Sequence, residues 1–124
     1  MSKGIVPRNN EIIIYSTSEG SIRVEVTYQD ETFWLTQKQI SGLFGVDVRT
    51  INEHLKSIFK SEELQPDSVI RKIRTTAADG KKYLTNFYNL DAIIAVGYRV
   101  NSRQATQFRI WATNTLKLSM GRKR

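Results

Sequence analysis

The sequence predicts an α+β domain, and three observations lead to this fold class. Residues 11–35 read as three short strands, residues 36–60 as two amphipathic helices joined by a tight turn, and residues 69–88 as a strand pair that precedes two more helices. Alternation of apolar and polar residues indicates a strand, whereas apolar residues at three- and four-residue steps indicate a helix. Both patterns occur in one chain of 124 residues, which is long enough to bury a single core.

The first strands are predicted from an isoleucine-rich segment and from strict alternation. Residues 11–17 are rich in isoleucine, and residues 21–28 alternate apolar with polar side chains, as a half-buried strand does. Polar turn residues separate these segments, and a third strand over Thr32–Leu35 follows the second turn. We therefore expect a small antiparallel sheet that leads directly into a helix.

Residues 37–56 have the spacing of a helix-turn-helix. Thr36 and Gln39 stand three residues apart, as in a capping box, where each side chain accepts a hydrogen bond from the other residue's backbone N–H. Gly45 interrupts the first helix where a left-handed residue is needed, and glycine adopts that conformation cheaply. Asp47 is expected to cap the second helix.

The second helix has one apolar and one polar face. Apolar residues recur at three- and four-residue steps from Val48 to Phe59, so that face should pack on the first helix. In DNA-binding members of this motif the second helix enters the major groove with its N-terminal residues on base edges. Arginine can grip guanine and asparagine adenine, each through two hydrogen bonds. The predicted base-contacting residues are Val48, Arg49, Thr50, Asn52 and Lys56.

Two other interpretations of this helix pair stay open. The helices can be core elements with a solvated polar face, or they can dock another protein. Glu53 lies on the polar face, where its carboxylate repels phosphate unless it accepts a hydrogen bond from a cytosine amino group. Asp47 is compatible with DNA if its carboxylate is occupied by capping. We favour DNA.

Beyond a polar loop that contains Pro66, residues 69–76 and 81–88 predict a β-hairpin with Ala78, Asp79 and Gly80 in its turn. A basic hairpin after a helix-turn-helix resembles a wing, which would lay cations along the phosphate backbone or reach the minor groove. The other interpretation is an exposed edge hairpin whose lysines discourage aggregation. The predicted phosphate-contacting residues are Arg71, Lys72, Arg74, Lys81 and Lys82 of the hairpin, Lys38 of the first helix, and Arg103 and Arg109 further along the chain.

Two helices are predicted after the hairpin. Asn89 is expected to cap a helix that is apolar on most sides and therefore buried, in which Gly97 allows another element to approach closely. Ser102 is expected to cap the last helix. Its apolar stripe contains Phe108 and Trp111, which we expect to be core anchors and not platforms for stacked bases.

The charge distribution favours a polyanionic partner. The chain has 19 Lys and Arg against 12 Asp and Glu, a formal charge of +7 and an isoelectric point near 9.9. Residues 1–70 hold 7 basic and 10 acidic residues, net −3, whereas residues 71–124 hold 12 basic and 2 acidic residues, net +10. The basic half must fold back beside the second helix if both are to touch one duplex. A charge excess can also serve solubility alone.

The residues offer little for catalysis or metal binding. His54 is the only histidine, and cysteine is absent, which excludes disulfides and thiolate metal sites. The acidic patch of Glu62, Glu63 and Asp67 has no further ligand types beside it and is expected to be a solvated loop. We expect a protein that is not an enzyme, has no cofactor or metal, and has no membrane segment or signal peptide. Its expected location is the bacterial cytoplasm, near the nucleoid.

Three segments resemble the N-terminal part of the bacterial virulence-protein RhuM family. They are WLTQKQISGLFGVDVRTINEHLKSIF, SVIRKIRTTAADGKKY and FYNLDAIIAVGYRVNSRQATQFRIWATNTLK, of which YNLDAIIAVGYRVNS is the most specific. The resemblance covers about Leu35 to Lys117. It implies a DNA-binding module similar to phage and viral Bro-N and KilA-N domains, found on genomic islands and near mobile elements, in proteins that usually continue beyond this length.

These elements predict a winged helix-turn-helix or Bro-N-like domain over residues 11–118, with a flexible lead at 1–10 and a basic tail at 119–124. The expected function is sequence-influenced binding of double-stranded DNA, as a transcriptional regulator or a mobile-element or genomic-island accessory protein. The alternative is an interaction module that docks an acidic protein from the same locus. RNA is disfavoured because its deep major groove does not admit a helix. A homodimer that reads paired half-sites agrees with the motif.

Overall fold

The computed structural model describes residues 11–17, 20 and 22–122, with side chains as far as residue 117. The expected lead at 1–10 lies outside the described residues, and so do residues 123–124 of the expected tail. Residues 119–122 belong to the last helix and do not form a separate tail. Over the described part of the chain five strands and five helices form an α+β fold. In chain order they are β1 (Glu11–Ser16), β2 (Arg23–Gln29), β3 (Thr32–Leu35), α1 (Gln37–Phe44), α2 (Val48–Lys60), α3 (Pro66–Val69), β4 (Ile70–Thr76), β5 (Lys82–Asn89), α4 (Leu90–Val100) and α5 (Arg103–Arg122).

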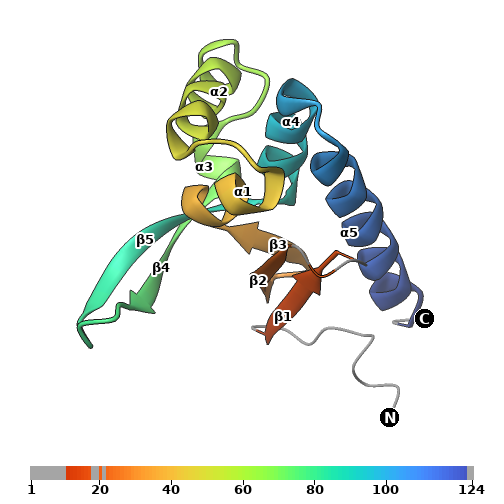
Figure 1. Cartoon of the computed structure of the whole chain (residues 1–124), viewed down its shortest axis with the longest axis horizontal. Coiled ribbons are helices and arrows are strands. Elements are labelled where there is room, and N and C mark those ends of the chain that lie inside the picture. The colour runs from red at the N-terminus through yellow and green to blue at the C-terminus, as the bar shows by residue number, and fades with distance from the viewer. Residues whose placement is uncertain (1–10, 18–19, 21, 123–124) are drawn as a thin grey trace.

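All five described strands join one antiparallel sheet, in the order β1-β2-β3-β5-β4 (Figure 1). The expected small sheet and the expected hairpin are therefore parts of the same sheet. The join is short, because β3 pairs with β5 only at Trp34 with Asn89 and at Leu35 with Tyr88. The rest of β4 and β5 pair with each other and project from the body of the domain as an arm.

The helices cover one face of the sheet, and the core lies between them. Alternation along β2 turns Val26 and Tyr28 inward, where both are buried. The last helix adds an aromatic cluster, since the Phe108 ring meets Tyr15 edge-on with centroids 5.2 Å apart and Trp111 stacks on Phe33 at 5.1 Å. Such ring pairs stabilise a core beyond their buried area. Phe108 and Trp111 are thus confirmed as core anchors.

Local signals set the start and end of the first helix as expected. The backbone N–H of Gln39 donates to Thr36 Oγ1 at 3.1 Å, and the N–H of Thr36 donates to Gln39 Oε1 at 2.9 Å, which completes the capping box. Gly45 has a φ of 72°, the left-handed conformation that ends the helix. The expectation for Asp47 is wrong in one respect. Asp47 stands at the N-cap of α2, but its carboxylate makes no capping hydrogen bond.

The expected polar loop after α2 is only partly a loop. Its end folds into the short helix α3, whose first residue is Pro66. Proline suits this position because its φ is already helical and its missing N–H would have no partner there.

The two helices after the hairpin begin as expected. Asn89 Oδ1 accepts the backbone N–H of Ala92 at 3.2 Å, and Ser102 Oγ accepts that of Ala105 at 3.1 Å. A Cβ at Gly97 would lie 3.3 Å from the Ala105 methyl and 3.5 Å from the Phe44 ring. Glycine therefore lets α4 approach α5 and α1, which confirms the expected close contact. Among the described helices, none combines the length and apolarity that crossing a bilayer requires.

Candidate nucleic-acid interface

Helix α2 is anchored by one buried face and exposes a charged one. Ile51, Leu55 and Ile58 are buried in the core. On the opposite side lie four exposed charged residues, and their spacing of three and four residues puts them on one stripe. They are Arg49, Glu53, Lys56 and Lys60. Arg49 and Lys56 therefore share an exposed face, as predicted, but Glu53 lies between them.

The other predicted base-contacting residues do not share that face. Val48, at the start of the helix, is 39% exposed, whereas Thr50 and Asn52 are half-buried on its two flanks. At about 100° per residue, two positions separated by one residue point about 160° apart around the helix. Thr50 and Asn52 thus point in different directions, to either side of the exposed charged stripe.

Asn52 is tied to the hairpin through α1. The side-chain amide nitrogen of Gln37 donates to Asn52 Oδ1 at 3.3 Å and to the Tyr88 hydroxyl at 3.0 Å. This relay joins α2, α1 and β5. An amide oxygen has two lone pairs, so Asn52 keeps one acceptor site and both N–H donors for another partner.

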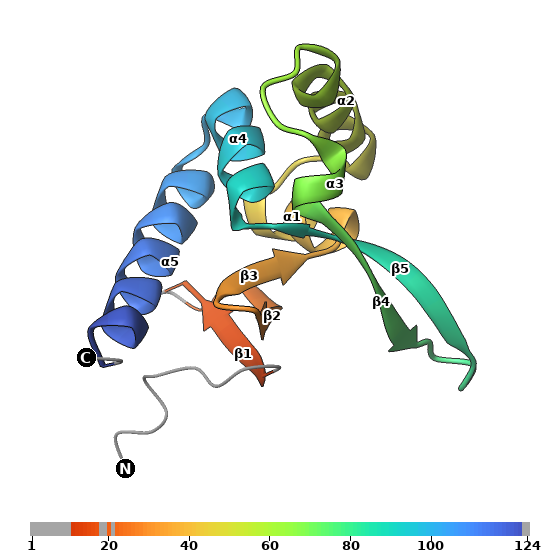
Figure 2. The ribbon, with the colours of Figure 1, turned by 180° about the vertical axis from the view of Figure 1, so that it is seen from behind.

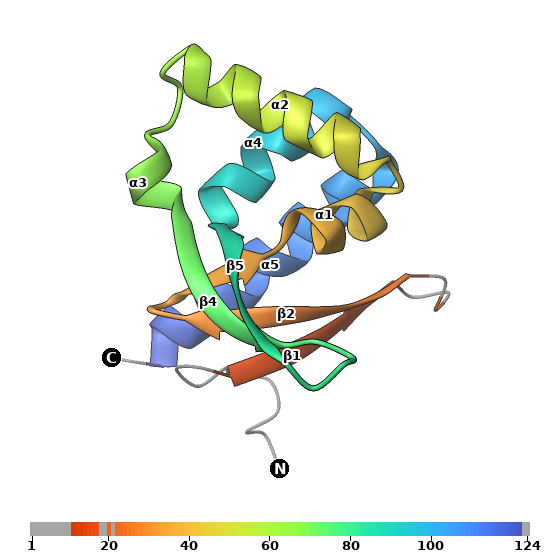
Figure 3. The same ribbon diagram turned by 90° about the vertical axis from the view of Figure 1, so that its left-hand side faces the viewer.

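The hairpin has two unlike faces, which its register defines. Residues directly opposite each other on β4 and β5 point to the same side, and along each strand the sides alternate. Tyr88 reaches Gln37 and thereby marks the face that looks toward α1 and α2 (Figure 3), which we call the helix-facing face. Its other members are Ile70, which lies opposite Tyr88, and the pairs Lys72 with Asn86, Arg74 with Leu84, and Thr76 with Lys82. Three of the predicted phosphate contacts therefore lie together on the helix-facing face.

Arg71 points to the opposite face, where the protein itself binds its guanidinium. Arg71 Nη1 donates to Gln29 Oε1 at 2.6 Å and forms an ion pair with the carboxylate of Asp30. The guanidinium also lies over the Trp34 ring, 4.4 Å from its centroid. These contacts argue against the prediction that Arg71 binds phosphate.

An open groove of about 1300 Å³ lies between the hairpin and the start of α1 and continues over β2. Its basic lining residues are Lys38, Lys72 and Arg74, and Glu25 is acidic. Lys38 is exposed on the first turn of α1. The groove therefore brings a cation of the first helix beside two cations of the hairpin, although they are far apart in the sequence.

Comparison with known proteins bears on the second half of the chain. Residues 68–122 match the family model described as Virulence protein RhuM family. The predicted resemblance to the RhuM family is confirmed for residues 68–117, which the prediction and the family model share. No curated protein and no solved structure was found to match the chain.

The RhuM-family match begins near the end of α3 and takes in the hairpin, α4 and α5. It includes every predicted phosphate-contacting residue except Lys38. Helices α1 and α2, with all the predicted base-contacting residues, precede it. The match therefore covers the hairpin and the last two helices, and it leaves the role of α2 to physical argument.

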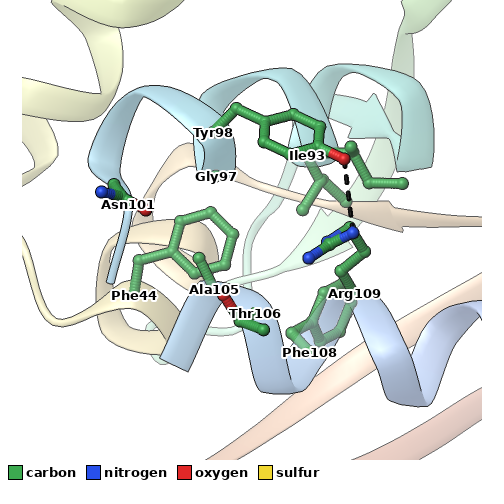
Figure 4. Close-up of a pocket in the computed structure, with 10 residues that line it drawn as sticks. Phe44, Ile93, Gly97, Tyr98, Asn101, Ala105, Thr106, Phe108 and Arg109 are labelled. Atoms are coloured by element: carbon green, nitrogen blue, oxygen red, sulfur yellow. Dashed lines mark hydrogen bonds between the residues drawn. The ribbon is translucent and has the colours of Figure 1, made fainter. Parts of the chain in front are cut away.

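The last predicted cations of the matched segment lie away from the hairpin. Helix α5 is on the far side of the domain from the hairpin in both views (Figures 1 and 2). Arg109 Nη1 donates to the Tyr98 hydroxyl at 3.3 Å, with its guanidinium 5.2 Å from the ring centroid, at the rim of a small pocket of about 80 Å³ between α4 and α5 (Figure 4). Arg103 is exposed. The residue before it, Ser102, donates its Oγ to the carbonyl of Phe44 at 3.5 Å, which places this start of α5 beside the end of α1. The predicted phosphate contacts thus divide into separate groups.

Proposed function

We propose that this protein binds double-stranded DNA as a winged helix-turn-helix module, with sequence-dependent contacts from α2 and phosphate contacts from the hairpin. The observation that carries the proposal is the relay from Asn52 through Gln37 to Tyr88, which links α2 through α1 to the root of the hairpin on its helix-facing face. One duplex can then touch both. In the biological setting that the RhuM family suggests, such a module would serve as a transcriptional regulator or a mobile-element accessory protein.

The positions of the charges support different roles for α2 and the hairpin. Arg49 and Lys56 lie on the exposed stripe of α2, and a major groove about 12 Å wide admits a helix with such side chains on base edges. Lys72, Arg74 and Lys82 lie on the hairpin, where they would neutralise phosphates and contribute affinity without sequence preference. Lys38 lies between these elements, on the groove.

Two carboxylates restrict how α2 can approach DNA. Glu53 is exposed between Arg49 and Lys56, and the Asp47 carboxylate is not used in capping. Both would repel phosphates. A pose in which Glu53 faces a base edge, where it accepts a hydrogen bond from cytosine, removes the conflict for one of them. Asp47→Asn should then tighten binding to all duplexes alike.

The same carboxylates favour a second candidate function, the docking of an acidic protein by the hairpin alone. In that case the stripe of α2 would face solvent. This function predicts weak binding to every duplex, with no preferred sequence.

The deciding experiment is a salt titration of binding to a pooled random duplex library, with the retained DNA sequenced as salt rises from about 50 to 200 mM. Enrichment of a defined motif supports sequence-dependent binding, and symmetry of that motif would indicate a homodimer on paired half-sites. Loss of all duplexes together supports the docking function. Lys72→Ala should weaken retention more than Lys117→Ala, which removes the same charge from an exposed position on α5.

A further inference from the structure

We propose that Arg71 is a positioning residue, which sets the direction in which the hairpin leaves the sheet, and that it is not a phosphate contact. Its consequence for affinity rests on the proposed DNA binding, whereas its consequence for the hairpin's orientation does not.

The hairpin needs such a device because its root is narrow. Beyond the two residue pairs that join β3 to β5, the strands pair only with each other. From residue 70 to residue 86 no side chain is fully buried. A two-stranded ribbon without a hydrophobic face is marginally stable and free to twist. Its direction therefore depends on the contacts at the root.

Arg71 is at that root and reaches three groups outside the hairpin. It is the second residue of β4, and its partners are Gln29 at the end of β2, Asp30 in the following turn, and Trp34 in β3. One planar guanidinium therefore connects the arm to the neighbouring part of the sheet. Arginine suits this role because it donates several hydrogen bonds in fixed directions while stacking on an aromatic ring, and lysine cannot do both.

The partners of Arg71 are themselves held in place. Asp30 and Glu31 have φ values of 53° and 64°, which makes a tight two-residue turn with both residues left-handed. The indole N–H of Trp34 donates to the backbone oxygen of Gln29 at 2.9 Å, which fixes the ring to the end of β2. The site that receives the guanidinium is thus formed by β2, β3 and the turn between them, without any residue of the hairpin.

The neighbouring residue provides a matched control. Arg71 and Lys72 carry the same charge and are adjacent, but they point to opposite faces of the hairpin. Lys72 lies on the helix-facing face, where its Nζ donates to Asn86 Oδ1 at 3.2 Å. A phosphate that approached Arg71 would meet the Asp30 carboxylate already paired with the guanidinium, and the two anions would repel each other, whereas Lys72 has one neutral partner within the hairpin.

The first test compares Arg71→Gln with Lys72→Gln in the salt dependence of binding to a labelled duplex of mixed sequence. Lys72→Gln should reduce the slope of log K against log salt by about 0.9, the value for one phosphate contact. Arg71→Gln should keep the slope and weaken binding by up to about fivefold at every salt concentration. Affinity falls with the fraction of correctly oriented hairpins, and an exposed ion pair shifts that fraction by about this factor. A slope reduced equally in both variants would overturn the proposal.

Asp30→Asn is a test in which general electrostatics and the positioning role predict opposite changes in the affinity for DNA. The substitution makes the protein more basic, so a general attraction to DNA predicts tighter binding. Loss of the Arg71 anchor predicts weaker binding. Combined with Arg71→Gln, it should add little, because the two residues share one interaction. Tighter binding by Asp30→Asn would contradict the positioning role.

A distance measurement tests the orientation without DNA. The chain has no cysteine, so spin labels can be attached at Ala78→Cys in the hairpin turn and Thr113→Cys on α5, both exposed positions. The distance distribution should be narrow in the parent and in Lys72→Gln, and broad in Arg71→Gln. If the parent binds no duplex but Arg71→Gln broadens the distribution, the proposed function fails and the positioning role stands. A narrow distribution in Arg71→Gln would overturn that role.

Discussion

Helices α1 and α2 and the hairpin of β4 and β5 both face DNA in our proposal, but different forces hold them. The helix pair buries Ile40, Leu43 and Phe44 of α1 against the core, together with three residues of α2. The arm of the hairpin, in contrast, buries none of its side chains from residue 70 to residue 86. A base-reading element needs fixed geometry, which the core supplies. A phosphate-binding arm can be held by a few polar contacts at its root, and those contacts can then set its direction.

The strongest test of this difference in packing is to truncate one leucine in the helix pair and one in the hairpin. Leu55 on α2 is 2% exposed and Leu84 on β5 is 63% exposed. Leu55→Ala should lower the free energy of unfolding by about 2 to 5 kcal/mol, because it leaves a cavity in the core. Leu84→Ala should change it by less than about 0.5 kcal/mol. Urea unfolding measures both. Similar losses would mean that the arm is packed as tightly as the helices.

Arg49→Ala tests whether the rigid region reads bases. Against the motif selected from the duplex library it should cost about 1 to 3 kcal/mol of binding free energy and relax the preference at one position. On random duplexes the loss should be smaller. Competition binding with the selected and scrambled duplexes measures the difference. Equal losses on both would remove α2 from the role of recognition helix.

The sequence predicted the elements well because their signals are local. The capping box at Thr36, the left-handed Gly45 and the alternation along the strands are each read within a few residues. The start of the last two helices at Asn89 and Ser102 was read in the same way. The side chain of Asp47 departed from its expected capping role, since the backbone of a helix start can form without that bond. The end of the expected loop after α2 and most of the expected tail also proved helical.

The contacts that organise the candidate site could not be read in this way. Gln37 and Tyr88 are 51 residues apart, and Asp30 and Arg71 are 41 apart. Both contacts depend on the pairing of β3 with β5. The periodicity within a single segment cannot predict which distant strands pair. Composition correctly indicated many cations after residue 70, but only the register assigns Lys72 and Arg74 to one face of the hairpin and Arg71 to the other.

Tyr88→Phe tests the link between the two regions. The change deletes the hydroxyl that accepts from Gln37 and keeps the buried ring, so it should cost about 0.5 to 1.5 kcal/mol. The loss should appear as faster amide hydrogen exchange where β5 meets α1. Tyr83→Phe is the control, since the Tyr83 hydroxyl donates to Asp79 in the exposed turn of the same hairpin. Equal exchange in both variants would mean that the relay does not couple the hairpin to the helices.

Lys81→Ala should have the smallest effect, and it tests the hairpin as a phosphate-binding arm. The turn should persist, because the bond to Asp79 Oδ1 comes from the backbone N–H of Lys81, which alanine retains. Lost charge is then the only change. Selected and scrambled duplexes should weaken by the same factor, and the salt slope should fall by about 0.9. A loss confined to the selected duplex would instead assign sequence reading to the hairpin and remove the contrast with α2.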